Sequence, residues 1–121
     1  MHKLDLLKLE SGLGLDEYIA SHYMGFENCS RGAGSPPGTE NRILIPPYST
    51  NPGAAFTLAE KTIPLNWYLV VVGPFSEGDR WAVTYTTNGD PLEIKPQEAP
   101  FKGDNLAILI CRAVIEIIEK E

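Results

Sequence analysis

The sequence lacks the features that mark several functional classes. Only 10 of its 121 residues are lysine or arginine, no three of these are consecutive, and 16 acidic residues bring the net charge to -6. Proteins that bind the phosphate backbone of a nucleic acid normally carry a basic stripe. The composition therefore argues against duplex nucleic acid as a partner, although backbone N–H groups and one or two arginines can still hold a small anion.

Cysteine pairs and long hydrophobic segments are also missing. Cys29 lies in a stretch rich in glycine and serine, Cys111 lies in an apolar helical pattern, and neither belongs to a CxxC motif. This usage is typical of reduced thiols in the cytosol, and we expect no metal and no other cofactor. The longest apolar runs, "WYLVVV" and "LAILIC", are too short to cross a bilayer, so we expect no membrane partner.

What is present fits one domain over residues 1–121. An apolar fraction of 43% and a charged fraction of 21% are ordinary for a globular protein. In "LDEYIASHYMGF", Leu15, Ile19 and Tyr23 recur at helical spacing, and Gly25 is expected to end this first helix. The following "FENCSRGAGSPPGTEN", residues 26–41, has the composition of a long irregular loop, either mobile or functional.

The stretch "IPPYSTNPGAAF" predicts the start of a second helix. Ser49, Thr50 or Asn51 can accept hydrogen bonds from the first N–H groups of a helix that begins at Pro52. An antiparallel hairpin is expected after this helix. Its first strand, in "NWYLVVVG", has the pattern of a strand covered on both faces, and its second, in "RWAVTYTT", alternates. We expect "NGDPLEIKPQEAPFKGD" to be an irregular connection.

The last helix, in "LAILICRAVIEIIEKE", is apolar nearly all round. Within residues 106–118 only Arg112 and Glu116 are charged. Such a helix must be covered nearly all round. We expect the sheet to cover one side and a second protomer another, and hence a homo-oligomer.

The motifs "LDEYIASHYMGF", "IPPYST" and "LAILICRAVIEII" follow one another along the chain, with the hairpin that contains Trp81 before the last of them. This series resembles the phage ABA sandwich domain family, small proteins of bacteriophages and prophages, over about the whole chain. The resemblance implies an α+β fold, an α-β-α sandwich in which a small antiparallel sheet is packed by three helices. Phe26 replaces the family's tryptophan and Asn51 its aspartate. The resemblance implies no established catalytic activity.

Candidate ligand-binding residues come from three places. The first place holds Tyr48, Ser49, Thr50 and Asn51. This segment either packs against the core and caps the helix, or it forms a ligand site in which its N–H and hydroxyl groups hold a phosphate while Tyr48 stacks on a base. A second candidate is Arg112.

Arg112 pairs either with Glu116 on its own helix or, at an interface, with a phosphate or a carboxylate of a partner. Trp81 and Tyr85 share a strand face, and they form either core or an aromatic wall.

No spacing sets apart a catalytic triad, a Cys/His pair or paired carboxylates. From the phage context we expect a non-enzymatic protein in the cytoplasm of the infected bacterial host. Our hypothesis is that it binds and sequesters a host nucleotide immune signal, a cyclic nucleotide or an ADP-ribose derivative. The alternatives are an interaction module that binds a host protein, and an enzyme that degrades a nucleotide.

Overall fold

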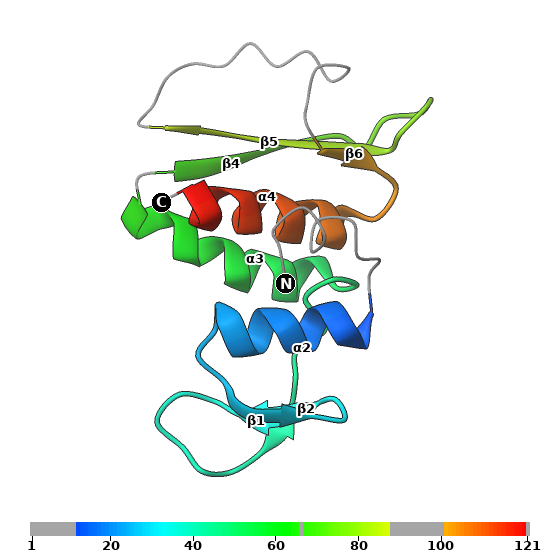
Figure 1. Cartoon of the computed structure of the whole chain (residues 1–121). Coiled ribbons are helices and arrows are strands. Elements are labelled where there is room, and N and C mark those ends of the chain that lie inside the picture. Colours follow the sequence, from blue (N-terminus) through cyan, green and yellow to red (C-terminus); the bar gives the residue numbers. More distant parts are fainter. Residues whose placement is uncertain (1–11, 66, 88–100, 121) are drawn as a thin grey trace.

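A computed structural model describes residues 12–65, 67–87 and 101–120 of the chain (Figure 1). These residues form three α-helices, one 3-10 helix and two three-stranded antiparallel sheets. The elements are α2 (Leu13–His22), β1 (Glu27–Ser30), β2 (Ala33–Ser35), β3 (Ile43–Leu44), α3 (Pro52–Ala59), η1 (Glu60–Leu65), β4 (Trp67–Val72), β5 (Trp81–Thr87), β6 (Phe101–Gly103) and α4 (Leu106–Lys120). The strand orders are β1-β2-β3 and β4-β5-β6.

The helices lie between the two sheets. In Figure 1 the β4-β5-β6 sheet forms one end of the molecule, α4 and α3 follow beneath it, α2 comes next, and the small β1-β2-β3 sheet forms the other end. The expected α+β class with antiparallel strands is confirmed. The expected α-β-α order of layers is not confirmed, because the described strands form two sheets and the described helices all lie to one side of the larger one.

The hydrophobic core is centred on α4. Nine of its residues are buried, with exposed fractions of 8% or less: Ala107, Ile108, Leu109, Ile110, Cys111, Ala113, Val114, Ile115 and Ile117. Ala55 and Leu58 of α3 are fully buried in the same cluster, and Val83 joins it from the sheet. The chain therefore covers α4 by itself. The reason for expecting a second protomer over this helix is gone, and homo-oligomerisation stays a prediction that needs another basis.

The hairpin of β4 and β5 is confirmed, with a register that runs from Trp67↔Thr87 to Val72↔Ala82. β4 is nevertheless an edge strand of the described sheet, and none of its residues is fully buried. The expectation that this strand is covered on both faces is therefore wrong. An apolar run identifies a strand more reliably than it identifies the strand's place in the sheet.

Residues 26–41 are not an irregular loop, since they contain β1 and β2, paired in antiparallel fashion. Asn28 and Arg31 adopt positive φ angles of 55° and 51°, and Gly32 follows at 80°. The N–H of Gly32 donates to the carboxylate of Glu17 at 2.6 Å, which ties the β1–β2 turn to α2. The short strand β3 completes this sheet by pairing with β2 through Gly34↔Ile43.

The connection expected after β5 is partly a strand. Its end forms β6, which pairs with β5 through Val83↔Phe101, while residues 88–100 lie outside the described residues. β6 has only three residues, which are too few to show a strand pattern in the sequence. It is a strand because it pairs with β5.

Placing a charge in the α4 core should unfold the protein. Ile115 is 1% exposed, so Ile115→Asp would bury an unpaired carboxylate at a cost of several kcal/mol. The control is Leu44→Asp, because Leu44 is 82% exposed. We expect thermal melts followed by circular dichroism to show loss of the folded state only for Ile115→Asp. A cooperative, nearly unchanged melt for this variant would contradict the central position of α4.

Candidate functional site

Ser49 is the centre of a buried polar contact between three parts of the chain, and its side chain is 0% exposed. The Ser49 N–H donates to Asp16 Oδ1 at 2.8 Å, and its Oγ accepts from the N–H of Gly12 at 2.8 Å. Its carbonyl accepts from Asn105 Nδ2 at 3.0 Å. Gly12 and Asp16 belong to the start of α2, and Asn105 directly precedes α4. We call these four residues the Ser49 junction.

Tyr48 lies in the core beside this junction. Its side chain is 1% exposed, and burial raises the pKa of its hydroxyl to about 12. The thiol of Cys111 in α4 donates to the carbonyl of Tyr48 at 3.1 Å. In this structure no base can stack on the ring of Tyr48, and the packing interpretation of this residue is the one that the geometry supports.

Asn51 caps α3. Its side-chain oxygen accepts from the N–H of Ala54 at 3.2 Å, and Pro52 is the first residue of the helix, as the sequence predicts. Thr50 and Asn51 are both exposed. The orphan N–H groups at this helix start are thus partly satisfied by the chain itself. The cluster acts as a helix start, and two of its four residues, Tyr48 and Ser49, point into the protein.

The other predicted ligand residues lie elsewhere. Trp81 and Tyr85 are half-buried on the sheet face that packs on the core, and Tyr85 meets Trp67 edge-on with ring centroids 5.2 Å apart. Arg112 is half-buried in α4 and has an interaction partner in the folded chain.

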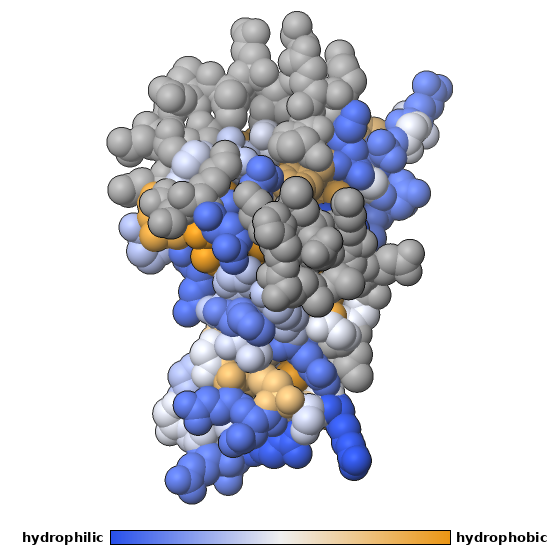
Figure 2. Space-filling view, viewed as in Figure 1, coloured by the Kyte–Doolittle hydropathy of each residue, from blue (hydrophilic) through white to orange (hydrophobic). Residues whose placement is uncertain are grey.

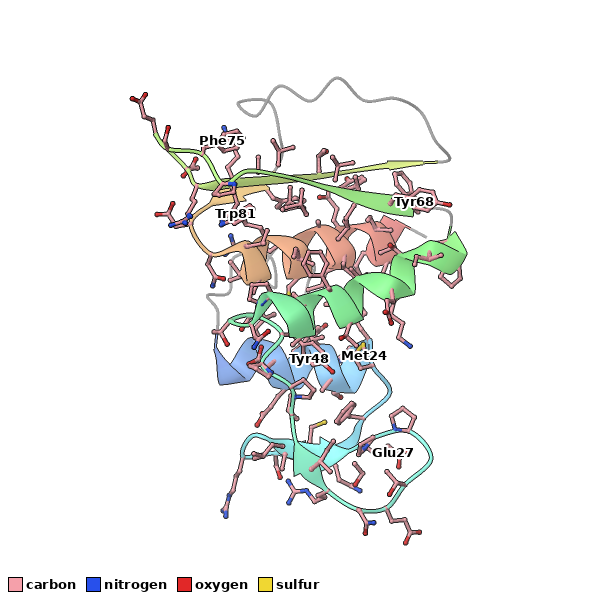
Figure 3. The ribbon with its side chains drawn as sticks, turned by 180° about the vertical axis from the view of Figure 1, so that it is seen from behind. Met24, Glu27, Tyr48, Tyr68, Phe75 and Trp81 are labelled. Carbon is pink, nitrogen blue, oxygen red and sulfur yellow. The ribbon has the colours of Figure 1, made fainter. Side chains whose placement is uncertain are left out.

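Figure 3 places Trp81 between the sheet and α4, and Tyr48 between α3 and α2. The structure does not bring the seven predicted residues into one site, because α4 separates the two aromatic groups.

Comparisons of the chain with protein-family models, curated proteins and solved structures find no match. The family resemblance therefore stays a prediction from the three motifs. Among the described residues, no helix is long and apolar enough to cross a membrane. Within the same residues, no three His, Cys, Asp or Glu side chains gather where they could hold a metal ion.

A surface that the sequence did not reveal lies between the α3–η1 segment and β4. A pocket of about 270 Å³ is lined there by Phe56, Ala59, Glu60, Thr62, Ile63, Trp67, Tyr68 and Leu69. Three large apolar side chains on it stay exposed: Phe56 (46%), Ile63 (56%) and Tyr68 (43%). We call this pocket with its exposed rim the η1–β4 patch. Among the described residues of this lining, Glu60 is the one that carries a charge.

The three figures agree on the position of this patch at one side of the molecule, next to the β4-β5-β6 sheet. Figure 2 shows apolar surface in the region where Figure 1 draws η1, and Figure 3 shows Tyr68 projecting from β4 near the same helix. Single exposed apolar residues are common on protein surfaces, but a contiguous group of them marks a contact site. A second pocket, of about 260 Å³, lies over residues 36–40 and contains Glu27 and Glu40, so it is polar and acidic.

The Ser49 junction predicts a difference between two neighbouring hydroxyls. Ser49→Ala leaves the part-buried N–H of Gly12 without its acceptor, and it should lower the free energy of unfolding by about 1–3 kcal/mol. Thr50→Ala removes an exposed hydroxyl, so it should change that free energy by less than about 0.5 kcal/mol. Urea titrations of both variants measure the difference. Equal losses of unfolding free energy in the two variants would contradict the stabilising role of the Ser49 junction.

The two thiols should differ in reactivity. Burial raises the pKa of the Cys111 thiol to about 12 and also raises that of the half-buried Cys29, so both hold less of the reactive thiolate at pH 8 than a free thiol. Only Cys29 is accessible, and we expect a disulfide reagent to label it slowly in the folded protein and Cys111 only after unfolding. Cys29→Ser should abolish labelling of the folded state. Rapid labelling of that variant would contradict the burial of Cys111.

Proposed function

We propose that this protein is a non-enzymatic interaction module that binds another protein through the η1–β4 patch. The single observation that carries the proposal is the pocket of about 270 Å³ with the exposed Phe56, Ile63 and Tyr68 on its rim. Exposed apolar groups of this kind become favourable only when a partner removes them from water. Aromatic side chains are also the residues that most often dominate binding energy at protein interfaces.

The charges around the patch favour an apolar partner over a nucleotide. A phosphate is held by arginines, lysines or free backbone N–H groups, whereas the one charged lining residue here is the acidic Glu60. An apolar side chain that enters the pocket meets Trp67, Ile63 and Leu69 instead. A partner with a basic residue beside its apolar anchor would complement Glu60.

The described residues also favour binding over catalysis. The Tyr23 hydroxyl donates to Glu119 at 2.7 Å, and this contact between two titratable side chains is exposed. Burial and this carboxylate raise the pKa of Tyr23 further above its usual value, which makes its hydroxyl a poorer proton donor. The pair joins the end of α2 to α4 and lies outside the η1–β4 patch. The described lining of the patch has Glu60 as its one carboxylate and contains no histidine, so it does not hold the paired groups of a common acid–base site.

Sequestration of a nucleotide immune signal in the bacterial cytoplasm remains the competing hypothesis. The phage resemblance supports it, and it also needs no catalytic group. It requires a site other than the one expected at Tyr48 and Ser49, because both side chains are buried. The two hypotheses differ in what is bound to the purified protein.

The experiment is site-specific photo-crosslinking in living bacteria. A photoreactive residue at position 63 lies in the patch, and the control at position 44 lies on β3, where Leu44 is 82% exposed. We expect covalent protein adducts from position 63 and none from position 44. The mass of each adduct identifies whether a second copy of the chain or another protein has reacted.

The absence of any protein adduct at position 63 would contradict the interaction module. Mass spectrometry of small molecules released by heat from the same purified protein tests the competing hypothesis. An unchanged nucleotide released in stoichiometric amount, together with no adduct, would favour sequestration.

A further inference from the structure

Among the strands that the structure describes, β4 has the edge that is best suited to pair with another strand. It contains six residues, Trp67–Val72, without charge and without proline. Among the described strands, none pairs with its outer edge. An edge strand presents a row of unpaired N–H and C=O groups, and proteins normally protect such edges with short strands, charges or proline.

The other edges of the two described sheets carry these protections. β6 has three residues and contains Lys102, and β3 has two residues that directly follow Arg42. β1 begins with Glu27 and contains a register shift in its pairing with β2. β4 differs from all three, because it is longer and uncharged. This difference indicates that the β4 edge is used for pairing.

The sequence of β4 is complementary to itself. Two antiparallel copies related by a two-fold axis perpendicular to the sheet keep the same side chains on the same face, provided that the axis passes at Leu69 or Val70. With the axis at Val70, Leu69 lies opposite Val71 of the second copy. No like charges meet in either register, although the chain as a whole carries a net charge of -6. A net charge of the same sign on two copies opposes their association in general, so a contact between them is favoured at an uncharged surface such as β4.

The η1–β4 patch lies alongside this edge. Trp67, Tyr68 and Leu69 belong both to β4 and to the pocket lining, and Tyr68 is exposed on the strand. A second strand added at the edge would cover the part of the patch that β4 provides. Pairing of the backbones and burial of the apolar rim would therefore act together, and both are needed for a stable contact.

We propose that the partner at this surface is a second copy of the chain, joined by antiparallel pairing of the two β4 edges into one continuous sheet of six strands. This inference rests on the proposed function, since it names the partner of the same patch. It gives homo-oligomerisation a basis in β4 instead of in α4. The dimer has two-fold symmetry and closes on itself, so no fibre forms.

Light scattering on the purified full-length chain tests the proposal. We expect a dimer at tens of micromolar, and Tyr68→Lys should weaken it by about tenfold or more, because lysine on a strand edge opposes pairing. Leu44→Lys is the matched control. It makes the same change of charge at an exposed apolar residue of the other sheet, so it should leave the dimer intact.

Hydrogen exchange at two protein concentrations separates edge pairing from contact through side chains alone. In the dimer the outward amides of β4 should exchange more slowly as concentration rises, while the amides of β3 should not change. A monomer at all concentrations, or a dimer without protection of β4, would overturn the proposal. Adducts of position 63 with a different protein, combined with a monomer in solution, would overturn the self-pairing and leave the interaction module standing.

Discussion

The fold depends on the Ser49 junction. Ser49 is fully buried, and its N–H, hydroxyl and carbonyl are all hydrogen-bonded, to Asp16, Gly12 and Asn105. A buried polar group that loses its partner costs about 1–3 kcal/mol, so these three contacts hold only in one arrangement of the segments that carry them. The junction thereby fixes where α2 and α4 begin relative to the segment that leads into α3. Ser49, which the sequence predicted as a ligand-binding residue, therefore has a structural role.

This arrangement determines which surfaces remain for function. The junction fixes the start of α4, and the rest of this helix lies between α3 and the β4-β5-β6 sheet (Figure 1). Most of its apolar residues are therefore buried in the core. The sheet then leaves β4 at its edge, with η1 beside it. Within the part of the chain that the structure describes, the proposed contact therefore uses apolar side chains and a strand edge at the periphery. A contact of this kind suits a protein chain better than a phosphate.

The motif "PPYSTN" carries much of the family resemblance, and in this chain its visible roles are structural. Tyr48 packs in the core, Ser49 forms the junction, and Asn51 caps α3. These roles concern the start of a helix and its docking, and architecture of this kind does not by itself determine a function. The resemblance is therefore a statement about architecture, and the proposed binding surface rests on other residues.

The sequence by itself determined the features that depend on neighbours along the chain. The start of α3 at Pro52 and the β4–β5 hairpin follow from capping, turn and periodicity signals, whereas the α+β class was an implication of the family resemblance. Only the tertiary structure decided the strands within residues 26–41, the edge position of β4 and the η1–β4 patch. Phe56, Ile63 and Tyr68 come from three elements, and local periodicity holds no information on which distant residues become neighbours in space.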